Sequence, residues 1–270
     1  MVVQHNMSAM NANRQLGVTT GTLSKSTEKL SSGYRINRAA DDAAGLSISE
    51  KMRSQIRGLN KASSNAQDGI SAIQTAEGAL NEAHSILQRM NELATQAAND
   101  TNTSADRTAV QSEVNALTKE LNRIASTTQF NTKNLLDGTF SGKNLQVGAL
   151  ANQSISISIG TMNATALSVD ALRVSTFTKA GSAMTAVQKA ISKVSTQRSN
   201  LGALQNRLEH TVNNLDNVSE NTQTAESRIR DTDMASEMVQ YSATSIIQQA
   251  GQSMLAQANS QTQGVLSLLQ

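Results

Sequence analysis

The chain has no cysteine, no proline and no tryptophan, and aromatic residues occupy only 2 % of its 270 positions. Without cysteine it cannot contain a disulfide framework, a thiolate metal site or a cysteine nucleophile. A compact core usually depends on bulky aromatic side chains for its buried area. Charged residues are also scarce, at 16 % against roughly 25 % in average soluble domains. This composition favours thin helical seams over a globular core.

Further absences bear on partners and location. The net charge is only +2, which argues against a nucleic-acid-binding protein, whose basic residues would gather on one face. No apolar run approaches the roughly 20 residues of a membrane span. The first ten residues lack both the basic start and the apolar centre of a cleaved secretory signal. We therefore expect no nucleic-acid partner and no membrane insertion, and any export would use a route without such a peptide.

Patterns typical of catalysis are missing. There is no His-Glu-x-x-His pair, no glycine-rich phosphate loop and no serine elbow, and the histidines fall on three different predicted helices: His5, His84 and His210. Two acidic pairs, Asp41-Asp42 and Asp231/Asp233, admit a carboxylate or cation site. Helix caps and junction ion pairs are the favoured interpretation, because both pairs stand where helices begin. The sequence predicts a non-enzyme without cofactor or metal.

The two ends of the chain carry weak helical patterns. Near the N-terminus one apolar residue recurs every seven positions, half of what a stable two-helix seam requires, so this helix should be marginal alone. The last helix has its own apolar spacing, which includes Val239, Ala243 and Ala250. We expect the terminal helices to share seams that also serve polymerisation. The seam residues are Leu16, Leu23, Leu30, Ile246, Met254, Val265 and Leu269.

Between the ends, three longer patterns predict long helices. Apolar residues from Ile48 to Ala97 follow three- and four-residue steps, as in a helix of roughly 50 residues. A heptad seam from Val110 to Ile124 ends near Thr127, and a third seam begins near Ala180. Gly58, Gly69 and Gly78 lie in the first of these helices, where small residues let another helix approach closely. Residues 129–178 contain glycine turns and the strictly alternating run Ser154–Ile159, which predicts hairpin strands.

Two charged breaks separate the terminal helices from the long ones. They contain Arg35, Arg38, Asp41 and Asp42 on one side, and Asp231 and Asp233 on the other. The predicted fold is mainly α: a discontinuous terminal coiled-coil domain of residues 1–40 and 233–270, and a long-helix rod domain of residues 41–232 that carries the β-hairpin region 129–178. Such rods with under-packed ends favour heterologous contacts that do not close, and hence an open helical polymer.

Several stretches resemble one family, the bacterial flagellins. They are the N-terminal residues 1–16, the segment Leu30-Ser-Ser-Gly-Tyr-Arg-Ile-Asn-Arg-Ala-Ala-Asp-Asp-Ala-Ala-Gly-Leu46, the segment Phe130-Asn-Thr-Lys-Asn-Leu-Leu-Asp-Gly138, and residues 248–259 and 265–269. The resemblance covers essentially the whole chain. It implies a structural subunit of the extracellular flagellar filament for swimming motility, with the terminal helices forming an inner tube. The outer variable domains of the family look absent, so this resembles a minimal form.

The resemblance also implies partners. Flagellins are exported unfolded by the flagellar type III apparatus and polymerise with other copies beneath a filament cap, beyond hook–filament junction proteins. An export chaperone would cover Met234 to Leu269. Thr262 stands where the family often has proline, which predicts a less interrupted last helix.

A further similarity concerns innate immunity. Residues 87–94 resemble the segment by which a Toll-like receptor senses many flagellins, although Asn91 replaces a common basic residue and Thr95 a usual valine. The implied contacts are Arg89, Leu93 and Glu113, with Gln88, Glu92 and Gln96 nearby. The alternative interpretation is that these residues make subunit contacts. The alternative function, from another class, is a secreted helical adhesin or effector that binds a host receptor and does not need its terminal helices.

Overall fold

The chain forms two compact units, described separately below. The structure, a computed structural model, describes residues 6–267, and the side chains of all of these except 262 and 265–267. Unit 1 consists of Met1–Ser54 and Asn221–Gln270, and unit 2 of Gln55–Glu220. The domain boundaries predicted at residues 40 and 233 fall in the segments between helices. The boundaries between the two units lie instead inside helices, after Ser54 in α2 (Ala43–Ala97) and after Glu220 in α5 (Phe177–Arg230).

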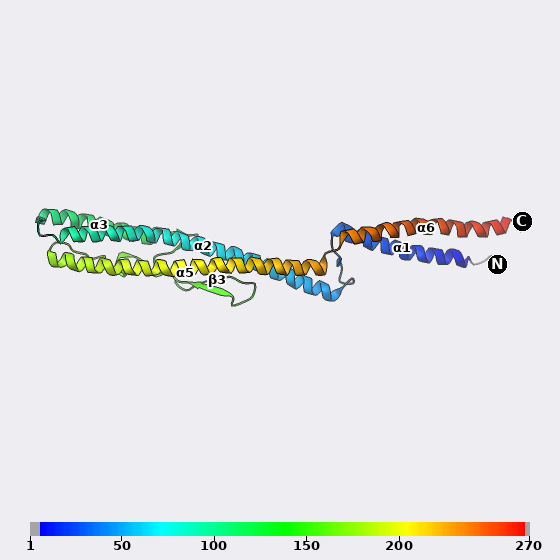
Figure 1. Ribbon diagram of the computed structural model, residues 1–270, viewed down its shortest axis with the longest axis horizontal. Helices are drawn as coiled ribbons and strands as arrows, with labels where there is room; N and C mark the ends of the chain where they lie inside the picture. The colour runs from blue at the N-terminus through cyan, green and yellow to red at the C-terminus, as the bar shows by residue number, and fades with distance from the viewer. Residues whose placement is uncertain (1–5, 268–270) are drawn as a thin grey trace. The chain divides into compact units, whose positions relative to one another are not determined.

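Unit 1 is dominated by two helices that lie side by side, α1 (Met7–Ser32) and α6 (Met234–Ser267) (Figure 1). The Asn6 side chain caps α1 by accepting a hydrogen bond from the Ala9 N–H at 3.0 Å. At the other end Gly33 adopts a left-handed conformation, with φ of +75°, and its N–H donates to the Lys29 carbonyl, a termination that favours glycine. α6 runs without interruption past position 262, which confirms the expectation drawn from Thr262.

Unit 2 is built on long helices: the larger part of α2, then α3 (Ser104–Thr127), and most of α5, with the short α4 (Ala164–Leu167) beside them (Figure 1). A capping box starts α3, in which Thr103 and Asp106 bond each other's backbone N–H. The apolar positions predicted for these seams meet in one core. Its fully buried members include Ile73, Leu80, Leu87, Met90, Leu121, Val187, Val194, Leu201 and Leu208. The predicted helical seams of unit 2 are confirmed.

The segment between α3 and α5 contains two antiparallel hairpins, as predicted. Strands β1 (Gln129–Phe130) and β2 (Lys133–Asn134) are joined through Asn131 and Thr132, whose φ values of +47° and +62° are typical of a type I′ turn. Strands β3 (Lys143–Gln146) and β4 (Ser154–Ile157) pair with Leu145 opposite Ile155. Along β4 the isoleucines are buried and the serines exposed, so the alternation of the sequence reflects one buried face.

The glycines of α2 have a different role from the one expected. A Cβ on Gly58 would lie 2.9 Å from the Cβ of Ala149, and one on Gly69 would meet the Leu145 side chain. Both of these neighbours belong to the region of the second hairpin, and Leu208 of α5 also lies 3.5 Å from the Cβ position of Gly69. Gly78 has nothing within 4 Å of a Cβ position. The expectation that another helix approaches closely is therefore wrong for Gly58 and Gly78, whereas Gly69 makes room for the hairpin and also lies in contact distance of α5.

Candidate functional site: the terminal helix pair and its junction

The α1–α6 contact in unit 1 is a heptad seam of small and polar residues. Its positions alternate by three and four along each helix, and all are buried or half-buried. On α1 they are Ala9, Ala12, Leu16, Thr19, Leu23, Ser26 and Leu30; on α6 they are Glu237, Tyr241, Thr244, Gln248, Gly251, Leu255 and Ala258. Because nine of these fourteen residues are small or polar, this seam buries less hydrophobic area than a coiled coil with leucine or isoleucine throughout, and the helix pair gains less stability from it.

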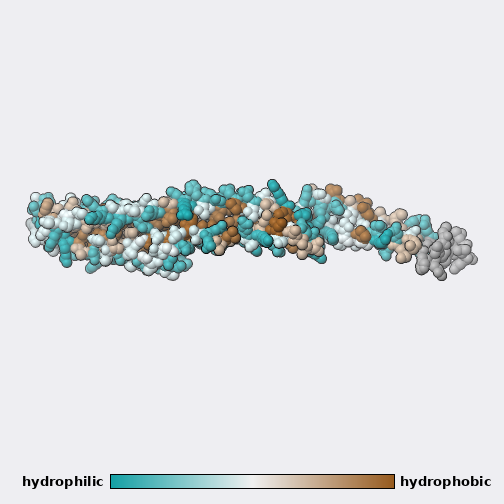
Figure 2. All heavy atoms as spheres, turned by 90° about the horizontal axis from the view of Figure 1, so that it is seen from below, coloured by the Kyte–Doolittle hydropathy of each residue, from teal (hydrophilic) through white to brown (hydrophobic). Residues whose placement is uncertain are grey.

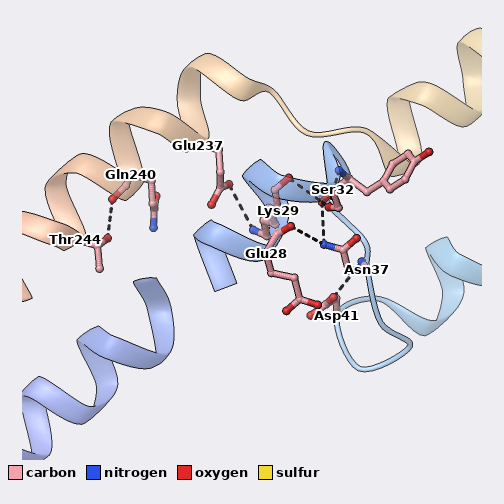
Figure 3. Close-up of polar contacts among 9 residues, drawn as sticks. Glu28, Lys29, Ser32, Asn37, Asp41, Glu237, Gln240 and Thr244 are labelled. Atoms are coloured by element: carbon pink, nitrogen blue, oxygen red, sulfur yellow. Dashed lines mark hydrogen bonds and ion pairs between the residues drawn. The ribbon is translucent and has the colours of Figure 1, made fainter. Parts of the chain in front are cut away.

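Three contacts along the seam define its direction. Lys29 Nζ lies 3.6 Å from a Glu237 carboxylate oxygen, an ion pair between the two helices that Figure 3 shows. Further along, Gln248 donates to the Thr20 hydroxyl at 3.4 Å, and Asn6 donates to the Ala258 carbonyl at 2.9 Å. Residue numbers rise on α6 as they fall on α1, so the two helices are antiparallel. The ion pair agrees with the charges of the two ends, because residues 1–40 contain five basic residues and one acidic residue, whereas residues 231–270 contain three acidic residues and no basic one.

The apolar stripe predicted on α6 exists but does not face α1. Ile246 is 67 % exposed and Met254 64 % exposed, and Val239 is also exposed. The expectation that Ile246 and Met254 pack in the seam with α1 is wrong within the chain, because small and polar residues on another side of α6 occupy that seam. Leu16, Leu23 and Leu30 are half-buried in it, as predicted. The side chain of Val265 and all of Leu269 lie outside the described residues.

Uncovered apolar side chains gather in unit 1. Among the described residues, ten of the thirteen exposed large hydrophobic side chains belong to it: Met7, Met10, Val18, Ile48, Met234, Met238, Val239, Ile246, Ile247 and Met254. In Figure 2, brown hydrophobic patches are visible on the surface of the α1–α6 pair. Exposed apolar residues this numerous mark an interaction surface.

The first charged junction, between α1 and α2, is tied together locally. Asp41 accepts hydrogen bonds from the backbone N–H groups of Arg38 at 3.0 Å and Asn37 at 3.2 Å. These two bonds, the Arg38 one foremost, lower the pKa of Asp41. Asp42 accepts from the Gly45 N–H at 2.8 Å and so caps α2, as predicted. The ion pair of Arg38 is with Glu28, at 2.9 Å.

The second junction, between α5 and α6, is joined to the first by backbone bonds. Tyr34 and Asp231 form an isolated β-bridge, and the Arg35 N–H donates to the Arg230 carbonyl at 2.7 Å. The Arg35 guanidinium also donates to the Ile229 carbonyl. The Arg230 guanidinium lies 4.5 Å from the centroid of the Tyr34 ring, a cation–π distance.

Asp233 completes this junction by capping α6. Its carboxylate accepts from the N–H groups of Ala235 at 3.0 Å and Ser236 at 3.2 Å. The helix-cap interpretation is therefore confirmed for Asp42 and Asp233, whereas Asp231 takes part through its backbone. The two breaks thus form one connected junction within unit 1.

Sequence patterns did not reveal several residues that hold unit 1. Ile36, in the first junction, is 1 % exposed, and among the described residues of this unit it is the large side chain most completely buried. Ser49 is fully buried and donates to the Glu226 carboxylate at 3.1 Å. Ser26 and Thr244 are buried in or beside the seam. Only the heptad spacing of Ser26 with Leu23 and Leu30 pointed to its position.

The residues implied to contact a Toll-like receptor lie in unit 2, on neighbouring faces of α2 and α3. Arg89 donates to Glu113 at 2.9 and 3.0 Å and to Glu92 at 3.1 Å. The hydrogen bond with Glu113, followed by that with Glu92, raises the pKa of Arg89. Gln88 and Gln96 are exposed beside them. The structure therefore joins Arg89, Glu92 and Glu113 in one exposed charged network.

The position of Leu93 differs from its predicted role as a receptor contact. Its side chain is 2 % exposed, because it packs in the core shared by the long helices of unit 2. It supports the Arg89 surface from beneath and does not lie on it.

Within residues 6–267, no group of three or more His, Asp or Glu side chains is arranged to hold a metal ion. No described helix is both long enough and apolar enough to cross a membrane. His84 approaches Gln88, with 3.0 Å between its Nε2 and the amide nitrogen, and His210 borders an open groove near Leu150.

Long helices with a terminal pair that leaves an apolar stripe uncovered define a class of protein, the self-assembling structural subunits. The family follows from comparison with known proteins. The model of the bacterial flagellin N-terminal helical region matches residues 3–141, and that of the bacterial flagellin C-terminal helical region matches residues 184–269. The chain belongs to the bacterial flagellin family. It is a minimal member without outer variable domains, because only residues 142–183 separate the two matched regions.

Individual flagellins and a flagellar filament core protein match this chain over its full length and theirs. The chain is 55 % identical to the flagellin of Halalkalibacterium halodurans over 271 residues and 50 % identical to that of Bacillus subtilis over 304, with all of both chains covered in each case. It is also 50 % identical over 286 residues, again with all of both chains covered, to the flagellar filament 31.3 kDa core protein of Treponema maltophilum. Among solved structures, the Bacillus cereus flagellin is 31 % identical, with a TM-score of 0.50, and the match covers 56 % of this chain and 88 % of that one.

Proposed function

We propose that this chain polymerises into the extracellular flagellar filament that drives swimming, and that the exposed stripe of α6 is a contact between copies. The single observation that carries this proposal is that α6 has two different faces. One face, around Thr244 and Gly251, is used within the chain against α1. The other, with Val239, Ile246 and Met254, is apolar and uncovered. In a homopolymer the partner for such a stripe is another copy, and membership of a filament-subunit family supports that partner.

The test is a charge placed on each face. Ile246→Asp changes an exposed side chain, so the helix content of the monomer should be unchanged and its free energy of unfolding should stay within about 0.5 kcal/mol of the parent value. It should nevertheless abolish polymerisation, because burying an unpaired charge costs several kcal/mol. The matched control is Gln252→Asp, an exposed position that lies about 120–160° around the helix from Val239, Ile246 and Met254 at 100° per residue, and this variant should polymerise.

Leu23→Asp provides a contrasting variant, because Leu23 is half-buried in the seam with α1. It should lose both α1–α6 pairing and polymerisation. Circular dichroism of the monomers and electron microscopy of filaments grown from added seeds measure the two effects. Filaments of normal yield from Ile246→Asp would refute the role given to the stripe.

Export and its partners extend the same proposal. We infer that the chain leaves unfolded through the flagellar type III apparatus, that an export chaperone covers residues 234–269, and that cap and hook–filament junction proteins contact the assembled subunits. The support is the weak, polar α1–α6 seam together with the exposed Met234 and Met238 on α6. A chain truncated after position 233 should fail to form a stable complex with the chaperone, whereas the Gln252→Asp chain should still bind it.

Recognition by an innate-immune Toll-like receptor is proposed for the monomer. Arg89, Glu92 and Glu113 form the exposed charged network that supports it, with Gln88 and Gln96 beside it. Arg89→Ala should reduce receptor activation by about tenfold or more, as truncation of an interface arginine often does. The control is Arg123→Ala, which removes a comparable exposed pair with Glu120 on α3. Equal activation by all three proteins would exclude this surface.

If the same residues instead make subunit contacts, Arg89→Ala should lower filament yield and leave receptor activation unchanged.

The adhesin or effector alternative is tested by removing both terminal helices. Host-receptor binding that is unrelated to motility and survives this deletion would favour it over the filament proposal.

A further inference from the structure

Figure 1 shows that the N-terminal ends of α3 and α5 lie at the same end of unit 2. A small basic pocket lies there. Its volume is about 250 Å³. Three cationic side chains line it, Arg107, Arg173 and Lys179, and hydroxyl groups come from Ser104, Thr108 and Ser175. None of its lining residues is acidic or apolar. The pocket is therefore lined by hydrogen-bond donors that carry positive charge.

The backbone that carries Arg173 is held in place by Gln111, which also lines the pocket. The Gln111 side-chain amide donates to the Leu172 carbonyl at 2.9 Å, and its oxygen accepts from the Val174 N–H at 2.8 Å. Val174 itself is fully buried. Because both neighbours of Arg173 are bound to α3, the Arg173 side chain starts from a defined position beside the pocket.

The positive charge of the pocket is only partly balanced. Arg107 donates to Asp100 at 2.9 Å and to the Asn99 carbonyl at 3.3 Å. Its Nε atom is buried and has no hydrogen-bond partner among the described residues. Within the described part of the chain, neither Arg173 nor Lys179 forms an ion pair. Two net positive charges and an unsatisfied guanidinium nitrogen thus remain at the pocket.

The other acidic residue near this end of α3 does not neutralise these cations. The Asp106 carboxylate is already engaged by the Thr103 N–H at 2.9 Å and the Thr103 hydroxyl at 2.7 Å. At the start of α5 the Thr176 hydroxyl accepts from the Lys179 N–H at 3.3 Å. The N-terminal ends of both helices are therefore capped. The hydrogen-bond donors and positive charges that remain available in the pocket belong to side chains.

We propose that this pocket binds a tetrahedral oxyanion, phosphate or sulfate, either free or as an ester. Guanidinium groups bind such anions through paired charge-assisted hydrogen bonds, and the hydroxyls supply further donors. The ends of two helices add a favourable field for negative charge. The anion bridges α3 to the segment that leads into α5, so its binding stabilises the folded state of unit 2 by mass action.

The test uses the monomeric full-length chain in a buffer that lacks phosphate and sulfate. Inorganic phosphate, and separately sulfate, is titrated to about 10 mM at constant ionic strength, and calorimetry is combined with NMR of the amides around the pocket. Higher concentrations would promote association by exclusion from the protein surface, so sedimentation checks that the chain stays monomeric. We expect saturable binding to one site, with amide shifts confined to residues 104–111 and 172–179.

Charge-neutral variants locate the site. The double variant Arg173→Gln with Lys179→Gln should weaken binding by about tenfold or more, as expected for the loss of charge-assisted bonds. Both side chains are exposed, so helix content should be unchanged. The matched control, Lys119→Gln with Lys189→Gln, removes two other exposed lysines of unit 2 and should bind normally.

Three outcomes would overturn the proposal: a response that does not saturate, equal weakening in the control, or the same effect with chloride. Glycerol 3-phosphate separates the two sources of the anion. Binding as tight as that of inorganic phosphate supports a site for phosphate esters, and binding of inorganic phosphate alone supports a site for the free ion.

Discussion

Gly58 and Gly78 lie on the same helix, α2, but their surroundings differ, and alanine at the two positions should have opposite effects on stability. In a helix interior, replacing glycine by alanine gains about 1 kcal/mol from the reduced freedom of the unfolded backbone and better helix propensity. Nothing lies within 4 Å of a Cβ at Gly78. Gly78→Ala should therefore stabilise the chain by about 0.5–1 kcal/mol.

At Gly58 the same gain is opposed by a collision. The new methyl group would lie 2.9 Å from the Cβ and 3.3 Å from the Cα of Ala149. Because a backbone atom cannot rotate away as a long side chain can, the loop must shift, at the cost of about 1–3 kcal/mol that is typical of overpacking. Gly58→Ala should thus range from neutral to about 2 kcal/mol less stable than the parent chain.

The assay is thermal and urea unfolding followed by circular dichroism, since about 1 kcal/mol corresponds to a shift of roughly 2–4 °C in a domain of this size. The two variants share the helix, the substitution and the effect on the unfolded chain, so their difference isolates the contact with Ala149. Equal stabilisation by both alanines would show that the 143–157 hairpin does not pack on α2 as described.

Two further predictions concern a titrating junction group and the core. The backbone N–H groups of Arg38 and Asn37 lower the pKa of Asp41 in the folded chain, so this carboxylate stabilises the fold above its ordinary pKa of about 4 and loses that effect as the pH falls through the lowered value. Asp41→Asn should lower the melting temperature at pH 7, and the difference from the parent chain should disappear in acid; a difference that is independent of pH would contradict this cause. Leu121→Ala, at a fully buried position, should cost about 2–5 kcal/mol in urea unfolding, whereas Leu150→Ala, at a side chain that is 68 % exposed, should stay within about 0.5 kcal/mol.

Periodicity predicted most of the helices well. The seam from Val110 to Ile124 predicted α3, and its end near Thr127 is confirmed. The long helix expected from about Ala180 begins instead at Phe177, because Thr176 provides the cap just before it by accepting from Lys179. Hydrophobic spacing could not show this start, since a cap depends on a hydroxyl and a backbone N–H, not on an apolar position.

The same method assigned the stripe of α6 to the wrong contact. Ile246 and Met254 are its conspicuous apolar residues, and a search for hydrophobic periods selects them. The contact with α1 instead uses Thr244, Gln248 and Gly251, which such a search ranks low. Gly58 was misassigned for a related reason: a small residue indicates close approach without indicating which element approaches, and here that element is the loop at Ala149.

The sequence by itself determined the helical class, the paired terminal segments, the two charged breaks with an aspartate pair where each following helix begins, and the flagellin resemblance. These depend on local spacing and on residue types that act within one or two helical turns. Only the tertiary structure decided which face of α6 meets α1, that Leu93 is buried beneath the Arg89 surface, and that Arg107, Arg173 and Lys179 line one pocket. Those facts depend on how segments far apart in the chain pack together, which no local pattern encodes.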